Sequence, residues 1–270
     1  MTLVLVLSGI VLFVLGAAVG SFLNVVVHRT LAGEDWSGSR SRCDHCGRQI
    51  AWYDNIPLLS FVALGGRCRH CRQPISLSHL VFEMLTGLLF VWWYLAGFVF
   101  FQLTQAPFQV LQPLFWLIVG VLLLIIAVTD ALFLIIPDAA VMGLFMLTVL
   151  YRVVLVSFGI MRPLDLALSV AATTAAAALF WLLWRLTRGR GLGLGDVKLV
   201  VPIGLLVGWP QLTVALLAAF VTGALVGVGL IGLGKRRLGQ VIPFGPFLVA
   251  GTLVALTAGG SIIRWYLSLL

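Results

Sequence analysis

The stretch GRGLGLGDVK at residues 189–198 leads a run of closely spaced glycines to a single carboxylate, Asp196. Glycine permits positive φ angles and close backbone approach, so Gly193 and Gly195 would let a second polypeptide come near that carboxylate. The apolar run from Val197 predicts a helix that begins at Asp196, where the helix dipole favours a negative charge. Taken alone, the pattern is more typical of a helix N-cap after a flexible loop than of a catalytic site.

A second carboxylate, Asp130, follows an apolar run, and Pro137-Asp138 comes shortly after it. Two carboxylates that converge from different helices can share one proton and hold a water molecule between them, which is the arrangement of an aspartic peptidase. We expect Asp130 and Asp196 to form such a pair, with Asp196 as the ionised base and Asp130 as the acid. Because Pro137 favours a helix start, Asp138 is better explained as a structural cap.

All four cysteines lie within residues 28–76, the only stretch long and polar enough to form a soluble domain. They form two C-x-x-C pairs, Cys43 with Cys46 and Cys68 with Cys71. Four thiolates on two tight turns suit a closed tetrahedral Zn²⁺ site, which would supply much of the folding energy of this loop. Disulfides are the weaker alternative if the loop is cytoplasmic, and His45 and His70 are possible substitute ligands.

The composition is that of an integral membrane protein, because 61% of the residues are hydrophobic and only 10% are charged. Crossing the hydrocarbon core takes about 20 apolar residues. We therefore predict an all-α polytopic membrane protein with about eight transmembrane helices, the sixth of them short. The predicted spans cover residues 3–27, 77–100, 108–129, 131–158, 164–186, 196–209, 211–233 and 243–268.

All but three of the 17 lysines and arginines lie in three segments, at residues 28–76, 185–198 and 235–237. With eight spans these segments share one face, and the positive-inside rule places them in the cytoplasm with both termini outside. The ends of the spans that carry Asp130 and Asp196 then face the cytoplasm as well. Topology and attraction to anionic lipids account for the net charge of +8, so no nucleic-acid partner is expected.

Polar residues also gather where the first two predicted spans approach the cytoplasm. Asn24 either packs against a neighbouring helix or belongs to a site. His79 and Glu83, one helical turn apart, either form a local ion pair or bind a small polar ligand. An apolar stretch over residues 54–64 predicts a segment that dips to the membrane surface.

Several pieces of the chain resemble, in order and spacing, the bacterial type IV prepilin peptidases, which are GxGD intramembrane aspartic proteases. These pieces are GSFLNVVVHR, CDHCG with RCRHC, WYDNIPLLSF, the spacing from Asp130 to Pro137-Asp138, GLGLGDVK and IPFGPF. The resemblance covers nearly the whole chain. It implies an inner-membrane endopeptidase that removes the leader of type IV prepilins or type II secretion pseudopilins at the cytoplasmic face. Many members also N-methylate the new N-terminus with S-adenosylmethionine.

The resemblance carries the catalytic pair onto Asp130 and Asp196, with Gly193, Gly195 and Lys198 as the supporting peptidase motif. It carries the metal site onto the four cysteines. The chain departs from the family pattern at Asp44, where proline is usual, and at Leu132-Phe133, where polar residues often follow the first catalytic Asp.

The resemblance also predicts two parts. Residues 1–107 would be associated with methyl transfer and would contain the first two spans and the cysteine domain. Residues 108–270 would form a six-span peptidase core. The candidate residues for binding S-adenosylmethionine are Asn24, Gly65, Gly66, His79 and Glu83.

Two alternatives remain open at this stage. Intramembrane Asp residues and Gly-broken helices also occur in small-molecule transporters, although the chain shows no internal repeat and such proteins have no cysteine domain of this kind. A GxGD peptidase without methyl transfer is the second alternative. The cysteine-bearing loop favours the bifunctional enzyme, because members that only cleave can dispense with it.

Overall fold

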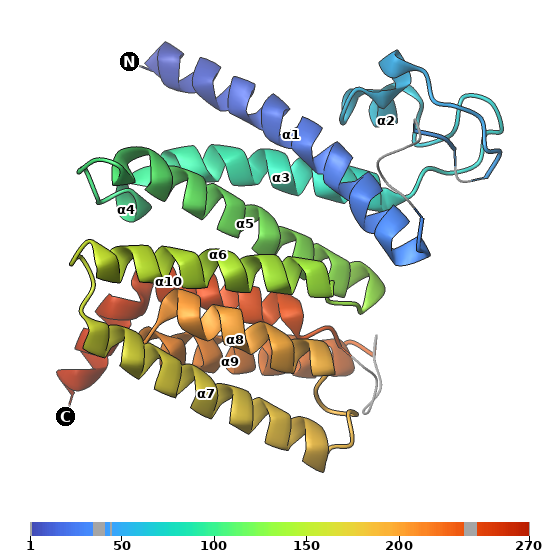
Figure 1. Ribbon diagram of the computed structural model, residues 1–270. Helices are drawn as coiled ribbons and strands as arrows, with labels where there is room; N and C mark the ends of the chain where they lie inside the picture. The colour runs from blue at the N-terminus through green and yellow to red at the C-terminus, as the bar shows by residue number, and fades with distance from the viewer. Residues whose placement is uncertain (1, 35–40, 44, 235–241, 270) are drawn as a thin grey trace. The chain divides into compact units, whose positions relative to one another are not determined.

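The computed structural model describes residues 2–34, 41–43, 45–234 and 242–269 (Figure 1). Over these residues the chain forms helices and two isolated β-bridges, with no β-strand. The helices are α1 (Thr2–Ala32), the 3-10 helix η1 (Trp52–Asn55), α2 (Leu59–Ala63), α3 (Leu77–Leu95), α4 (Gly97–Phe100), α5 (Phe108–Phe133), α6 (Asp138–Ser157), α7 (Pro163–Leu186), α8 (Leu194–Val207), α9 (Gln211–Gly232) and α10 (Gly245–Leu267).

Among the described residues, seven helices are long and apolar enough to cross a membrane, namely α1, α3, α5, α6, α7, α9 and α10. They correspond to seven of the eight predicted spans. The predicted short span is α8, whose 14 residues cover roughly 21 Å, less than the hydrocarbon core of about 30 Å. The chain is therefore an all-α, multi-pass membrane protein, which confirms the fold class expected from its composition.

The chain divides into two compact units, Met1–Leu124 and Ile125–Leu270, and the division falls within α5. In the first unit, α1 packs closely against α3 because glycines face the contact. A Cβ on Gly20 would lie 2.5 Å from the carbonyl oxygen of Phe82, and a Cβ on Gly16 would lie 2.6 Å from that of Thr86. Small residues of this kind let two membrane helices approach each other. The close contact brings Asn24, at the end of α1, against the start of α3.

In the second unit, α8 is the most enclosed helix, and Leu199, Val200 and Ile203 are fully buried. It packs against α6, α7, α9 and α10 (Figure 1). At Gly204 an added Cβ would lie 2.5 Å from Thr173 Oγ1, so the contact with α7 requires glycine. A helix this short leaves backbone groups inside the membrane region, and only a protein environment can satisfy them.

Arg152 of α6 satisfies two of those groups at the C-terminal end of α8. Its Nε donates to the Leu205 carbonyl at 2.9 Å, and its Nη2 donates to the Leu206 carbonyl at 3.0 Å. The last carbonyls of a helix have no partner within the helix, and a cation is favoured at that end of the dipole. Arg152 therefore fixes one end of the helix that carries Asp196 in its first turn.

Candidate functional site

Asp130 lies near the C-terminal end of α5 and is only 6% exposed. Its Oδ2 accepts a hydrogen bond of 2.7 Å from the backbone N–H of Gly245, the first residue of α10. A Cβ at Gly245 would lie 2.7 Å from that same oxygen, so only glycine fits beside the carboxylate. The motif IPFGPF at residues 242–247 did not by itself indicate a role for Gly245. In the structure, Gly245 is a direct hydrogen-bond partner of Asp130.

Asp196 lies in the first turn of α8 and is also 6% exposed. The helix begins at Leu194 with Gly193 as its N-cap, so the prediction that it begins at Asp196 was wrong by two residues. The reason is that Gly193 has the extended cap conformation and donates its N–H to Asp196 Oδ2 at 3.0 Å. This is the half of a capping box in which an acidic residue at the third helical position binds the cap.

The second glycine of the motif, Gly195, brings α8 close to the chain that precedes α6. A Cβ at Gly195 would lie 3.1 Å from the side chain of Ile136, closer than nearly all real contacts of that kind. A Cβ at Gly193 would lie 3.2 Å from Asp196 Oδ2, so both glycines have a steric reason to be glycine, and both serve to position Asp196.

The structure brings Asp130 and Asp196 near enough for their carboxyl groups to interact electrostatically. Each is held through its Oδ2 by a backbone N–H, from Gly245 and from Gly193 respectively. Asp196 Oδ1 is buried and has no hydrogen-bond partner among the residues that the structure describes. A buried polar atom that lacks a partner is costly, and such atoms are concentrated at catalytic sites and at bound waters. The arrangement can therefore hold a water molecule against a carboxylate.

Asp138 has a different environment, because it is the first residue of α6 and its side chain is 74% exposed. It accepts two hydrogen bonds from Lys198 Nζ, at 2.8 and 3.0 Å. The lysine of the glycine motif thus pairs with Asp138. The pair links the start of α6 to the first turns of α8.

The four cysteine sulfurs lie within 4.8 Å of one another, and none of the cysteines forms a disulfide. The Sγ atoms of Cys43 and Cys71 are 3.8 Å apart. Metal–sulfur bonds of about 2.3 Å in a tetrahedron separate the sulfurs by roughly 3.8 Å. The cluster therefore has the spacing of a four-thiolate metal site.

Two hairpins of the same local structure present these sulfurs. In the first, the Cys43 N–H donates to the Arg48 carbonyl at 2.9 Å, and an isolated bridge joins Arg42 to Gln49. The second hairpin repeats this arrangement. There the Cys68 N–H donates to the Gln73 carbonyl at 2.9 Å, and a bridge joins Arg67 to Pro74. The residue after each pair has a positive φ, 66° at Gly47 and 61° at Arg72, so the second turn places a strained non-glycine residue where the first has glycine.

In the second pair, hydrogen bonds to sulfur favour the thiolate at Cys68 but not at Cys71. The backbone N–H groups of Cys71 and His70 lower the pKa of Cys68 to about 6. The Gln73 N–H acts to lower the pKa of Cys71, but burial and the three neighbouring thiols raise it to about 11. A metal ion bound to the four sulfurs would displace the protons of these thiols. Asp44 lies outside the described residues, and His70 contacts Arg48 Nη1 at 3.2 Å.

A cavity of about 760 Å³ lies within the first unit, between the end of α1, the cysteine hairpins, the η1–α2 segment and the start of α3. Its lining includes Asn24, His79 and Glu83 but neither Gly65 nor Gly66. Asn24 Nδ2 and His79 Nδ1 are 2.8 Å apart, whereas Asn24 Oδ1 is buried and finds no hydrogen-bond partner within the described part of the chain. Three of the five residues considered for cofactor binding thus meet at one cavity, and one of them carries an unpaired acceptor.

Glu83 has a backbone partner that the sequence did not suggest. Its Oε2 accepts a hydrogen bond of 2.7 Å from the N–H of Leu58. Leu58 has a φ of 61°, and the next N–H, of Leu59, donates back to the Pro57 carbonyl at 2.6 Å. This is a γ-turn of the strained kind with a positive central φ. The Glu83 carboxylate thus holds a strained loop against α3.

The fold and these sites define a multi-pass helical membrane protein with a buried carboxylate pair and a four-thiol cluster. The model of the bacterial peptidase A24 N-terminal domain matches residues 14–96, and that of the type IV leader peptidase family matches residues 116–228. The chain belongs to the type IV leader peptidase family.

Curated relatives match along almost their whole length. A prepilin leader peptidase/N-methyltransferase of Aeromonas hydrophila is 32% identical over 95% of this chain and 92% of its own. Proteins of the same name from Stutzerimonas stutzeri and Pseudomonas aeruginosa are each 34% identical over 94% of this chain, and over 92% and 91% of their own. No solved structure matches the chain significantly.

Proposed function

We propose that this chain is a prepilin leader peptidase and N-methyltransferase. It removes the leader of type IV prepilins or type II secretion pseudopilins and then methylates the new N-terminal amine. The observation that carries the peptidase activity is the buried pair Asp130 and Asp196. Each Oδ2 is held by a glycine N–H, and no described residue bonds to Asp196 Oδ1. Full-length similarity to enzymes named for both activities supports the second one.

In the peptidase reaction, Asp196 is the general base and Asp130 the general acid. A carboxyl oxygen that accepts an N–H bond is a poor place for a proton, so the proton of Asp130 belongs on Oδ1 rather than on Oδ2. Asp196 Oδ1 takes a proton from the water as the water attacks the scissile carbonyl, and Asp130 donates to the developing oxyanion. The tetrahedral intermediate then collapses as the C–N bond breaks. The proton held by Asp196 passes to the leaving amine, and Asp130 recovers its proton from the hydroxyl as the carbonyl re-forms. The two carboxyl groups titrate as a pair, because like charges this close do not both ionise.

For methyl transfer, the cavity of the first unit is the proposed site. Its volume of about 760 Å³ lies within the usual range for sites that enclose a small ligand. S-adenosylmethionine, when bound, supplies the methyl group. The unpaired Asn24 Oδ1 and the Glu83 carboxylate are acceptors suited to the ammonium group of such a zwitterion.

The four cysteines would hold one structural Zn²⁺. Two observations support this assignment. The sulfurs of Cys43 and Cys71 are 3.8 Å apart, and two hairpins closed by backbone hydrogen bonds present the cysteines. Zinc bound here would order the loop between α1 and α3, whose hairpins form one wall of the cavity.

The proposed location is the bacterial inner membrane, with the catalytic pair and the cysteine loop at the cytoplasmic face. The clustering of basic residues supports this orientation and favours contact with anionic lipids. The basic segment 235–237 lies outside the described residues.

The test uses the purified chain in proteoliposomes with a synthetic prepilin and isotope-labelled S-adenosylmethionine, read by mass spectrometry. We expect both loss of the leader and one labelled methyl group on the new N-terminus. Asp130→Asn and Asp196→Asn should abolish cleavage while still methylating a precleaved pilin. Cleavage without methylation would establish the peptidase-only alternative, and the absence of both would reject the proposal.

A further inference from the structure

Between the two cysteine hairpins, η1 and α2 belong to a short segment, residues 52–63, in which three large apolar side chains are strongly exposed. The exposed fraction is 80% for Trp52, 69% for Leu59 and 75% for Val62. Single exposed apolar residues are ordinary on a protein surface. Three in one short segment, within a loop rich in arginine, form a patch that needs a partner.

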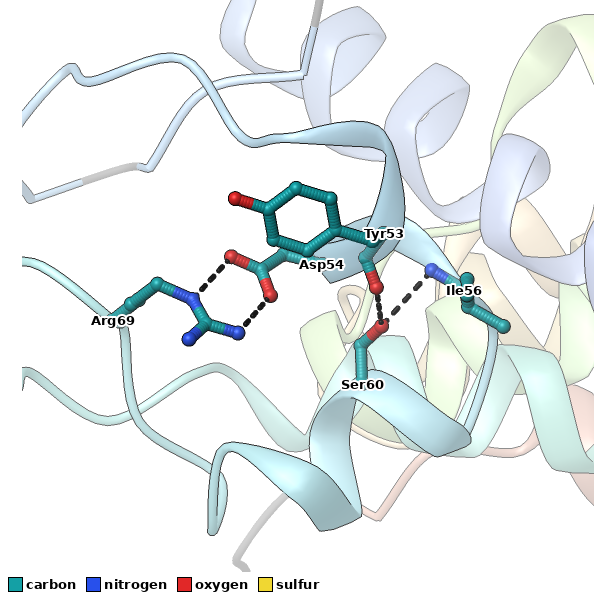
Figure 2. Close-up of polar contacts among 5 residues, drawn as sticks. All are labelled: Tyr53, Asp54, Ile56, Ser60 and Arg69. Carbon is teal, nitrogen blue, oxygen red and sulfur yellow. Dashed lines mark hydrogen bonds and ion pairs between the residues drawn. The ribbon is translucent and has the colours of Figure 1, made fainter.

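The exposure of these side chains does not result from a loose backbone, because polar contacts hold the segment in place (Figure 2). Ser60 Oγ accepts from the Ile56 N–H at 3.0 Å and donates to the Tyr53 carbonyl at 3.0 Å. Arg69 forms two hydrogen bonds to the carboxylate of Asp54, at 2.8 and 2.6 Å, and lowers its pKa through them. The segment is thus presented outward in one conformation.

The contact between Leu58 and Glu83 sets the depth of this segment. The 19 residues of α3 cover roughly 28 Å, about the thickness of the hydrocarbon core, so α3 needs its whole length to cross. Leu77 therefore lies near the membrane boundary, and Glu83 lies roughly 9 Å further along the helix. The Glu83 side chain leans back toward the start of α3, so the hydrogen bond of 2.7 Å holds the backbone of Leu58 between the levels of Leu77 and Glu83, on the membrane side of that boundary.

Non-helical backbone at membrane depth is tolerated only where protein or a cavity satisfies its polar groups. The 52–63 segment meets that requirement. Ile56, Ser60 and Phe61 line the cavity, and the polar groups described above bond within the protein. The most exposed large apolar side chains of the segment are those of Trp52, Leu59 and Val62.

We propose that the 52–63 segment is inserted in the bilayer, with Trp52, Leu59 and Val62 in contact with lipid. Tryptophan is enriched at the boundary between headgroups and acyl chains, and short apolar segments bury their apolar face there. The arginines of the surrounding loop complement anionic headgroups. The segment forms the lipid-facing wall of the cavity. The insertion of the segment does not depend on the proposed orientation of the chain. Only the assignment to the cytoplasmic leaflet rests on that orientation.

The test measures the depth of Trp52 in the full chain reconstituted into phosphatidylcholine and phosphatidylglycerol vesicles. The emission of Trp52 is the difference between the wild type and Trp52→Phe, since the remaining tryptophans are common to both. We expect this component to be blue-shifted and to lose most of its intensity when the acyl chains are brominated near their glycerol end. Aqueous iodide should quench it weakly.

The matched control is Gln49→Trp in the Trp52→Phe background, because Gln49 is exposed on the first cysteine hairpin. Its emission should be red-shifted, quenched by iodide and insensitive to brominated lipid. Changing Leu59 and Val62 together to serine should shift the Trp52 component to the red, and unchanged metal content would show that the loop remains folded.

Three results would overturn the proposal. The first is a Trp52 component that iodide quenches as strongly as it quenches Trp at position 49. The second is a blue shift that develops only when a prepilin peptide is added, which would make the patch a protein-docking surface. The third is a shift that depends on protein density in the vesicles, which would indicate a second copy of the chain. None of these readouts uses enzymatic activity, so failure here and failure of the proposed function are distinguishable.

Discussion

Replacing Gly245 with alanine should inactivate the peptidase while leaving methyl transfer intact. Gly245 donates its N–H to Asp130 Oδ2 at 2.7 Å, and a Cβ at this residue would lie 2.7 Å from the same oxygen and 3.2 Å from Asp130 Cβ. The atoms that would have to move are a backbone segment and a side chain on a buried helix. Neither is a flexible surface group that could turn aside.

The magnitude follows from these distances. Ordinary contact between nonbonded heavy atoms is about 3.5 Å, so the carboxylate or the start of α10 must shift by roughly 0.5 to 1 Å. Misplacing a catalytic group by about 1 Å can cost about 100-fold in rate. Weakening the hydrogen bond to the protonated, neutral carboxyl group of Asp130 removes about 0.5–1.5 kcal/mol, which corresponds to a further factor of about 2 to 13. We therefore expect kcat/KM for prepilin cleavage to fall by about 100-fold or more.

The assay compares cleavage of a synthetic prepilin with methylation of a precleaved pilin by the same preparation. Gly260→Ala is the matched control, because Gly260 lies on the same helix and an added Cβ there meets only the Arg264 side chain, at 3.6 Å. That variant should cleave normally. If Gly245→Ala cleaved within about threefold of the wild-type rate while remaining folded, the contact with Asp130 would be unnecessary and the proposed geometry of the pair would be refuted.

Four further predictions concern other parts of the chain. Asp138→Asn should retain measurable cleavage in the assay that finds Asp196→Asn inactive, because Asp138 is exposed and paired with Lys198; the reverse pattern would mean that the wrong carboxylates have been paired. Cys71→Ser should lose the one zinc per chain found by metal analysis of the wild type and should reduce stability or methyl transfer more than cleavage; no zinc in the intact, reduced wild type would exclude the metal site. Glu83→Ala should impair methylation of a precleaved pilin, because the Leu58 N–H loses its acceptor beside the cavity, and unchanged methylation would return Glu83 to a structural role. Arg152→Met should lower the free energy of unfolding by about 2 kcal/mol or more, because two carbonyls at the end of α8 lose a charged donor, and a thermal midpoint equal to that of the wild type would contradict this.

Much of this protein is determined by local sequence. A membrane-spanning helix satisfies its own backbone, so hydropathy alone located seven long helices and indicated that the sixth predicted span is short. The two C-x-x-C pairs form their turns from neighbouring residues, and their spacing predicted the cluster. The Gly-x-Gly-Asp motif predicted a carboxylate in the first turn of a helix, although the cap at Gly193 moved the helix start to Leu194.

The contacts that complete the sites were decided only by the tertiary structure, because they join residues far apart in the chain. Asp130 and Gly245 are separated by 115 positions, and no local periodicity predicts which backbone N–H meets a given carboxylate. Leu58 and Glu83, 25 positions apart, meet through a strained γ-turn that neither propensity nor hydropathy suggests. Asn24 and His79 face one cavity because small residues let α1 approach α3, whereas Gly65 and Gly66 do not line it. Residue types and spacing therefore indicate which chemistry the chain carries. Close packing between distant segments decides which atoms contact the residues that perform it.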